Sequence, residues 1–264
     1  MSGRGNMAHA LTFSPANAKL RKLAKHRSMR RWLRHDRHVY SFDLLSGWAC
    51  PFANACLSKV QTRSDGTRYL EDGARAEYRC FSASQEAVFT ATYAMRTRNF
   101  TALRTAQTTA RMYDLLSSGL PDQCGVLRLH VAGDFFNAAY FRAIVKLARA
   151  YPDRLFYAYT KSLPYWIEQH RDVHDLDNLI LTASYGGRSD HLIDTHQLRS
   201  VRVVYSTYAA RQHKLPLDHD DSHAADPTRR SRSFALLIHG QQASGTDAQR
   251  AVTRLAGRGS YTRS

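Results

Sequence analysis

The stretch Val126-Leu-Arg-Leu-His-Val-Ala-Gly-Asp134 decides the fold class of this chain. Its apolar-rich run is typical of a buried strand, and the glycine and aspartate end it. Helical periodicity follows over 137–150, and a second strand pattern covers 155–160. A strand, a helix and a strand in this order predict a parallel pair with a right-handed crossover.

The same alternation continues on both sides of this stretch. We expect four further strands, at 38–45, 178–184, 201–206 and 233–239. Six such units predict an α/β fold, a six-unit (βα)6 partial TIM-like barrel, although they could also lie open as a doubly wound sheet. In either arrangement the site forms at the carboxyl ends of the strands. We assign residues 39–264 to this single domain.

The segment between the first two predicted strands combines an insertion with helices. The turn signal Ser64-Asp-Gly-Thr67 predicts a hairpin-like insertion within 57–79. Helical character then runs from 82 to 118, which we expect as two helices broken near Asn99.

Three of the four cysteines lie in the loop after the first predicted strand, at 46–80. Residues 46–56 read Ser-Gly-Trp-Ala-Cys-Pro-Phe-Ala-Asn-Ala-Cys, and Cys80 follows the insertion. So few cysteines, clustered in this way, indicate a metal site rather than a disulfide framework. The soft thiolates of Cys50, Cys56 and Cys80 favour an iron–sulfur cluster, zinc or copper(I). Cysteines without any metal are the alternative, and Cys124 is a distant possible fourth ligand.

Small, polar and charged residues gather where the predicted strands end. Gly133 and Asp134 precede a helix, whose exposed N–H groups suit a zwitterionic or phosphate-bearing ligand, although plain turn chemistry explains them equally well. Lys161 follows the third strand and could neutralise an anion. Ser184 and Tyr185 follow the fourth strand, and with Lys161 they are our candidates for catalytic residues.

The charge of the chain indicates polyanionic partners. The net charge is +16, and residues 1–38 hold ten Lys and Arg but the single acid Asp36. We expect a basic N-terminal arm over 1–38 that contacts the phosphates of DNA or RNA, with a solvated charged helix as the alternative. We expect no contact with a membrane, because no apolar run reaches the roughly 20 residues of a span.

The segment Asp218-His-Asp-Asp-Ser-His223 is a dense cluster of carboxylates and imidazoles. Such a cluster could bind a hard divalent metal, as in nucleases. A solvated acidic loop is the alternative, because the segment precedes the last strand and so lies at the amino end of the sheet.

Several consecutive motifs resemble a family of phage proteins known as gene product 88. They are Ser-Gly-Trp-Ala-Cys-Pro (46–51), Tyr-Arg-Cys-Phe-Ser-Ala-Ser (78–84), Arg-Leu-His-Val-Ala-Gly-Asp-Phe-Phe (128–136), Tyr-Ala-Tyr-Thr-Lys-Ser-Leu-Pro (157–164) and Thr-Ala-Ser-Tyr-Gly-Gly (182–187). The resemblance runs from about Ser41 to the predicted closing helix at 247–255. It implies a phage protein in the cytoplasm of an infected host cell.

At a greater distance, the order of features resembles the radical S-adenosylmethionine enzymes. These enzymes carry three cysteines after the first strand of a six-unit partial barrel and a glycine-rich segment after the second. The resemblance implies a [4Fe–4S] cluster on Cys50, Cys56 and Cys80, contacts of Gly133 and Asp134 with the methionine amine of S-adenosylmethionine, and a cavity lined by Lys161 and Ser184. The third cysteine lies 24 positions after the second here, so the insertion must return Cys80 to the other two.

Three functions follow from these patterns. The first is an iron–sulfur, radical S-adenosylmethionine-like enzyme that acts on a nucleic acid or a nucleotide. The second is a non-catalytic nucleic-acid-binding protein with a structural zinc or iron–sulfur site. The third is a metal-dependent nuclease that uses residues 218–223.

Overall fold

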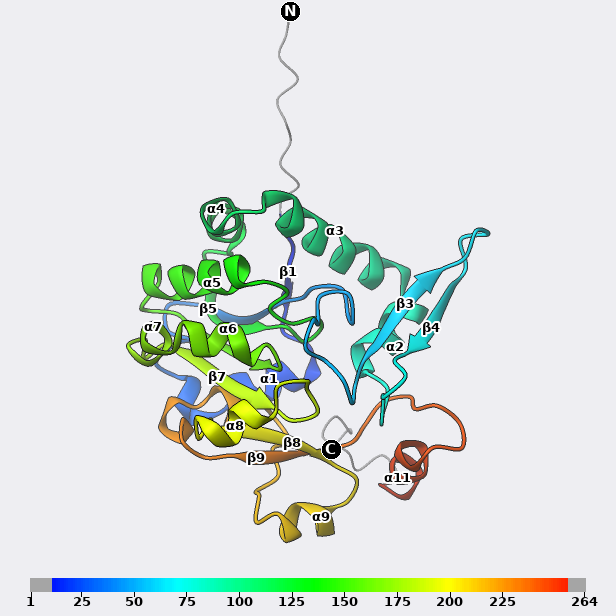
Figure 1. Ribbon diagram of the computed structural model, residues 1–264. Helices are drawn as coiled ribbons and strands as arrows, with labels where there is room; N and C mark the ends of the chain where they lie inside the picture. The colour runs from blue at the N-terminus through cyan, green and yellow to red at the C-terminus, as the bar shows by residue number, and fades with distance from the viewer. Residues whose placement is uncertain (1–10, 256–264) are drawn as a thin grey trace, which may run out of the picture.

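The computed structural model describes residues 11–255, which form a mostly parallel sheet between layers of helices (Figure 1). The sheet strands within these residues are, in spatial order, β1 (Phe13–Pro15), β2 (His38–Phe42), β5 (Cys124–Leu129), β6 (Leu155–Thr160), β7 (Leu179–Ser184), β8 (Ser200–Val204) and β9 (Phe234–Leu237). In this sheet β2 runs parallel to β5, β6, β7, β8 and β9, and β1 pairs with β2 in the antiparallel sense.

Helices connect these strands. They are α1 (Ala18–Ala24), α2 (Phe81–Val88), α3 (Thr90–Ala106), α4 (Thr109–Gly119), α5 (Ala138–Ala150), α6 (Leu163–Glu168), α7 (His170–His174), α8 (His191–Thr195), α9 (Thr207–Gln212), α10 (Ser222–Ala225) and α11 (Asp247–Leu255), with 3-10 helices η1 (Arg27–Met29) and η2 (Pro227–Arg229). The α/β class is as expected.

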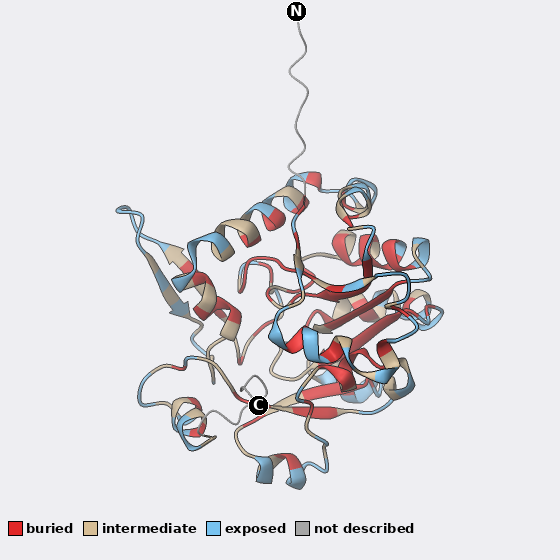
Figure 2. Cartoon of the chain, turned by 180° about the vertical axis from the view of Figure 1, so that it is seen from behind, coloured by how far each residue is buried: buried red, intermediate tan, exposed pale blue. Residues whose placement is uncertain are grey.

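The sheet is open, so the expected barrel is not confirmed. Its edges are β1 and β9, which do not pair with each other. Both faces of the sheet are covered, because alternate side chains of one strand point to opposite faces. Leu127 packs in the cluster that holds α4 and α5, whereas Val126 packs with Leu20 of α1. The face that a partial barrel would turn toward its cavity is filled here by α1 and α10. Figure 2 shows the resulting buried strands from behind.

Residues 11–38, expected as an arm, are part of this packed structure. Phe13 pairs in register with Phe42 of β2. Leu20 and Leu23 of α1 are fully buried, and Trp32 is 2% exposed. The few apolar residues of α1 therefore pack against the sheet, and the helix is not a solvated charged one. Residues 1–10 of the expected arm lie outside the described residues.

The insertion is the predicted hairpin, whereas the helix boundary near Asn99 was wrong. β3 (Ser58–Thr62) and β4 (Arg68–Asp72) form a two-stranded ribbon that projects from the body (Figure 1). Helix α3 runs through Asn99, whose side chain accepts a bond from the N–H of Thr12 and donates to the carbonyl of Thr12, each at 2.9 Å. An asparagine with such a partner outside the helix does not compete with the helix backbone.

No helix within residues 11–255 is long and apolar enough to cross a membrane.

Candidate functional site

The cysteine loop after β2 folds over the carboxyl end of β7. The carbonyl of Gly186 accepts hydrogen bonds from the N–H groups of Asn54 (3.2 Å) and Ala55 (2.9 Å). The carbonyl of Phe52 accepts from the N–H of Arg188 at 2.9 Å. These backbone bonds hold the segment between Cys50 and Cys56 against the turn that follows β7.

The hairpin returns the chain to this loop. The carbonyl of Ala55 accepts from the N–H groups of Glu77 (2.8 Å) and Tyr78 (3.1 Å). The N–H of Cys80 donates to the hydroxyl of Ser58 at 3.3 Å, and Cys80 is the N-cap residue of α2. These bonds therefore bring Cys80 back to the neighbourhood of Cys56, although the hairpin separates the two residues in sequence.

The thiols of Cys50, Cys56 and Cys80 interact electrostatically. Burial raises the pKa of Cys50 well above its ordinary value, and the charges of Asp134, Cys80 and Cys56 raise it further. Burial, followed by the charge of Cys56, raises the pKa of Cys80 to about 11. We call Cys50, Cys56, Cys80 and Asp134 the thiol site. Across residues 11–255, no group of three or more His, Cys, Asp and Glu is placed so that it could hold a metal ion.

Cys124 lies apart from the thiol site. It begins β5 and pairs with His38, at the amino end of the sheet. The thiol is fully buried in the core, which raises its pKa to about 12. The length of β5, about 17 Å at roughly 3.3 Å per residue, separates Cys124 from the carboxyl end.

Gly133 and Asp134 hold the loop after β5 in position. Gly133 has a φ of +85°, and a Cβ here would lie 2.7 Å from the Cβ of Leu44. The Oδ1 of Asp134 accepts from the N–H of Phe135 (2.7 Å) and the hydroxyl of Thr160 (2.6 Å). Its Oδ2 accepts from the N–H of Lys161 at 2.8 Å. Both residues therefore have structural partners of their own.

Lys161 and Ser184 lie beneath the cysteine loop. The ammonium of Lys161 donates to the hydroxyl of Ser184 at 2.6 Å. A Cβ at Gly186 would lie 2.9 Å from the Cβ of Ala55 and 3.8 Å from the Cε of Lys161. The pair thus joins the ends of β6 and β7 directly under the docked segment of the loop.

Tyr185 faces a different surface. Its hydroxyl donates to the carboxylate of Asp194 at 3.0 Å, and the guanidinium of Arg202 lies 3.7 Å from its ring centroid. Burial raises the pKa of Tyr185, and the bond to Asp194 raises it further. The structure thus brings Lys161 and Ser184 to the loop but not Tyr185.

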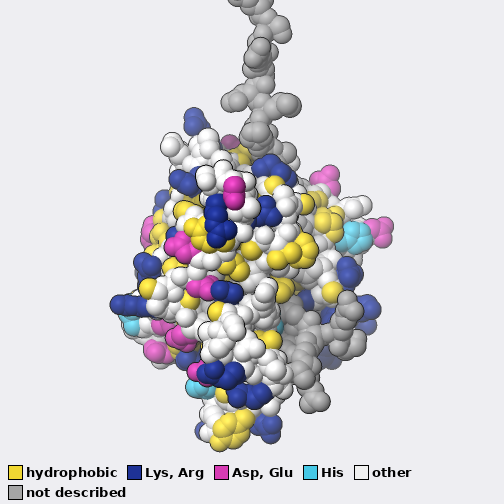
Figure 3. Space-filling view, turned by 90° about the vertical axis from the view of Figure 1, so that its right-hand side faces the viewer, with side chains coloured by type: hydrophobic (Ala, Val, Ile, Leu, Met, Phe, Trp, Pro, Cys, Tyr) yellow, Lys and Arg dark blue, Asp and Glu magenta, His cyan; other side chains and the backbone are white. Residues whose placement is uncertain are grey.

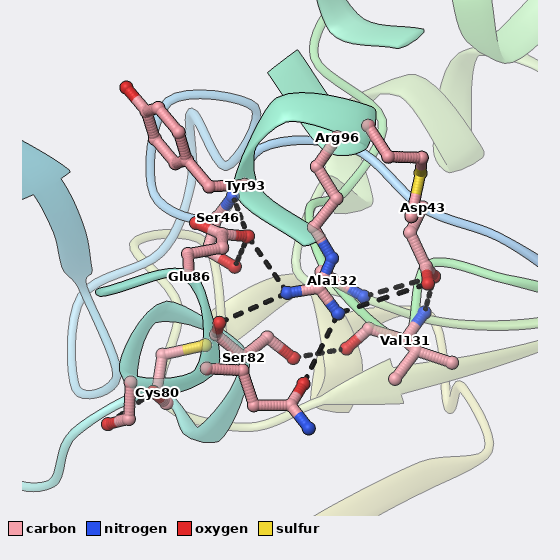
Figure 4. Close-up of polar contacts among 12 residues, drawn as sticks. Asp43, Ser46, Cys80, Ser82, Glu86, Tyr93, Arg96, Val131 and Ala132 are labelled. Carbon is pink, nitrogen blue, oxygen red and sulfur yellow. Dashed lines mark hydrogen bonds and ion pairs between the residues drawn. The ribbon is translucent and has the colours of Figure 1, made fainter. Parts of the chain in front are cut away.

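A buried ion network that the sequence did not predict supports the thiol site (Figure 4). The carboxylate of Glu86 in α2 accepts from the N–H (3.1 Å) and hydroxyl (2.8 Å) of Ser46 and from the guanidinium of Arg96 (3.0 Å). Arg96 in α3 also donates to the carbonyl of Ser82 at 3.1 Å. These bonds fix the start of the cysteine loop to the helix that Cys80 begins.

Asp43 continues this network toward β5. Its Oδ1 accepts from the N–H groups of Val131 (2.8 Å) and Ala132 (3.4 Å), and its Oδ2 lies 3.9 Å from the guanidinium of Arg96. Burial raises the pKa of both Asp43 and Glu86, and the positive charge of Arg96 opposes the shift. In the sequence, the only indication of this network is the presence of Glu86 and Arg96 in the two predicted helical segments.

The 218–223 segment is neither a solvated loop nor an open metal site. Asp221 is fully buried and pairs with Lys19 of α1 and Arg128 of β5, each at 2.7 Å. The hydroxyls of Tyr157 (3.0 Å) and Tyr159 (2.9 Å) also donate to it. Burial acts to raise the pKa of Asp221, but Arg128 and Lys19 outweigh it and hold the pKa well below the usual range. The expected solvated loop is therefore wrong, because cations of the fold enclose this carboxylate.

Comparison with known proteins places the chain in a sequence family. Residues 9–256 match the family described as gene product 88. No curated protein and no solved structure matches the chain.

Proposed function

We propose that this chain, which belongs to the gene product 88 family, is an enzyme whose Cys50, Cys56 and Cys80 thiolates hold an iron–sulfur cluster. The observation that carries the proposal is the thiol site itself. Three half-buried thiols, two from the cysteine loop and one from the start of α2, interact electrostatically near the carboxyl end of a parallel sheet. Ligands of α/β proteins bind at this end of the strands.

The residues of the thiol site fit a thiolate-bound metal. Burial and mutual repulsion oppose the thiolate form here, and a bound cation reverses both effects, because a coordinating thiol is deprotonated. Soft thiolates select iron–sulfur clusters or zinc. Three protein ligands leave one position of the metal centre open to another molecule. The cysteine loop must move to close around a metal, since the described residues do not form a metal-holding group as they stand.

The expected contact of Gly133 and Asp134 with S-adenosylmethionine has less support than the cluster. Asp134 already accepts three hydrogen bonds from the protein, and Gly133 is packed against Leu44. Asp134 is also 5% exposed, so most of its accepting capacity is used inside the protein. The proposal therefore rests on the cluster and derives no step through S-adenosylmethionine.

Lys161 supplies the positive charge of this site. An ammonium carries three N–H donors, and one of them binds Ser184. The remaining donors suit an anionic group held under the cysteine loop. Metal-dependent cleavage by 218–223 has no comparable support, because Lys19 and Arg128 already neutralise Asp221.

Metal content tests the proposal. The full chain is purified without oxygen, and its absorbance spectrum, iron and zinc are measured beside Cys80→Ala and the matched control Cys124→Ala. We expect about four irons per chain in the wild type and the control, and a loss of most iron in Cys80→Ala. Stoichiometric zinc without iron would instead favour a structural site. Equal metal in all three proteins would falsify the three-cysteine site.

A further inference from the structure

The outer face of the hairpin carries exposed aromatic rings with cations beside them. Trp48 is 45% exposed and Tyr69 is 39% exposed. The ammonium of Lys59 lies 4.8 Å from the ring centroid of Trp48, and the guanidinium of Arg63 lies 4.7 Å from that of Tyr69. Each large apolar surface therefore has a positive charge in contact with it.

The ribbon geometry places these groups on one face. Lys59 and Tyr69 belong to the same side, because Lys59 pairs with Glu71 and Gln61 pairs with Tyr69. Val60 on the other side is buried. The indole N–H of Trp48 donates to the carbonyl of Val60 at 3.1 Å, which fixes the ring against the ribbon. We call Trp48, Lys59, Arg63 and Tyr69 the hairpin platform.

A basic groove adjoins the base of the hairpin. It encloses about 570 Å³ and lies between the cysteine loop, the end of the hairpin and the turn after β7. Arg75 and Arg188 line it and are exposed, and Asn54 and Leu57 bring its wall next to Cys56. Figure 3 looks onto this side of the molecule, where basic side chains lie among apolar and acidic ones.

The chemistry of these two surfaces suits single-stranded nucleic acid. Proteins bind such strands with aromatic side chains on which bases stack and with cations that follow the phosphates. A duplex offers no unstacked base to an aromatic ring. Glu71, which shares the face, lies 3.7 Å from Lys59, so its charge is offset there. The net charge of +16 attracts any polyanion to the chain.

We propose that single-stranded nucleic acid binds across the hairpin platform, with bases on Trp48 and Tyr69 and phosphates on Arg75 and Arg188. The platform and the thiol site share chain segments, because Trp48 precedes Cys50 by two positions and the hairpin joins Cys56 to Cys80. A strand bound across the groove would pass beside Asn54 and Leu57, the neighbours of Cys56. This inference rests on the proposed enzyme and names its substrate class.

Tryptophan fluorescence provides a direct test. Trp32 and Trp166 are 2% and 8% exposed, so Trp48 is the tryptophan within reach of a stacked base. The full chain is titrated with a 12-nucleotide oligothymidine, the matching oligouridine and a 12-base-pair duplex. We expect both single strands to quench the emission and to bind at least about tenfold more tightly than the duplex. The two single strands distinguish DNA from RNA as the source.

Variants locate the effect on the platform. Trp48→Phe should remove the quenching, and Trp48→Ala with Tyr69→Ala should weaken binding by roughly ten- to a hundredfold, as measured by polarisation of a labelled strand. Tyr208→Ala, which removes a ring that is 67% exposed on α9, should leave the affinity unchanged. Circular dichroism verifies that each variant is folded.

Other outcomes would overturn the inference. These are absence of binding, equal binding of duplex and single strand, an affinity that survives the double substitution, or a dimer in sedimentation that the same substitutions dissociate. Metal content separates this inference from the proposed enzyme. A chain that holds iron but binds no strand contradicts only the platform, whereas strand binding without any metal contradicts only the cluster.

Discussion

The cluster around Asp221 and the thiol site are both groups of potential metal ligands, but their electrostatics are opposite. Around Asp221, the cations of Lys19 and Arg128 lower the pKa of the carboxyl. In the thiol site, the neighbours of Cys50 are themselves acids, and each raises its pKa. A buried acid with cationic partners is a completed structural element, whereas buried acids that repel one another gain most from a bound cation.

The first prediction concerns the Asp221 cluster and has the largest expected effect. Asp221 has a φ of +63°, which asparagine tolerates, so Asp221→Asn changes mainly the charge. It removes the carboxylate charge with which Lys19 and Arg128 pair at 2.7 Å inside the protein. We expect the free energy of unfolding to fall by roughly 3–5 kcal/mol, measured by urea denaturation.

An exposed ion pair serves as the control for Asp221→Asn. Glu168 pairs with Arg142 at 2.9 Å, but its side chain is about half exposed. Glu168→Gln should cost at most about 1 kcal/mol, because water screens such a pair. Equal effects of the two substitutions would mean that burial of the Asp221 cluster does not determine its contribution.

The second prediction concerns how the loop at the thiol site is held. Gly133 and Gly66 both have a positive φ, but a Cβ at Gly133 meets Leu44, whereas one at Gly66 meets nothing within 4 Å. Gly66→Ala should therefore cost about 1–2 kcal/mol from backbone strain alone. Gly133→Ala should cost roughly 2–4 kcal/mol, because steric overlap is added to the strain.

Urea denaturation of the two glycine variants provides the measurement. If Gly133→Ala is no more destabilising than Gly66→Ala, the loop has room beside Leu44. Gly133 would then be available to a ligand, as the sequence resemblance implied, and the structural role assigned to it here would be wrong.

The sequence predicted the elements whose signals are local. β6 and α11 have the predicted bounds, because an apolar run and a helical pattern each end at clear turn residues. α5 begins after Asn137, whose side chain accepts from the N–H of Tyr140 at 2.8 Å as an N-cap. The hairpin followed from its Asp-Gly turn.

The features that the sequence did not predict depend on distant partners. Residues 11–38 look too polar in sequence to be part of the core. Lys19 is buried there because it pairs with Asp221, which lies far along the chain. Likewise, the burial of Arg96 in α3 is explained by its bond to Glu86, which also binds Ser46. Local density of metal-ligand residues was misleading for the same reason: the dense 218–223 segment is enclosed by cations, whereas the hairpin returns Cys80 to the neighbourhood of Cys56.

The third prediction sharpens the comparison, because Asp218 lies within the Asp221 cluster but has the electrostatics of the thiol site. It is 1% exposed, and burial together with the charge of Asp221 raises its pKa to about 7. The fold therefore favours the protonated form. The stability that this form contributes is complete below the ordinary value of 3.8 and is lost as the pH rises to about 7.

Asp218→Asn should flatten this pH dependence, because asparagine does not titrate. One pKa unit corresponds to about 1.4 kcal/mol, and Asp221 shares the titration, so we expect the wild type to lose roughly 1–2 kcal/mol more than the variant between pH 4 and 7. Urea unfolding at several pH values measures the difference. Asp220→Asn is the control, since the pKa of Asp220 is lowered and its loss should not flatten the curve. Parallel curves for wild type and Asp218→Asn would show that Asp218 ionises normally, and that Lys19 and Arg128 balance both carboxylates of the cluster.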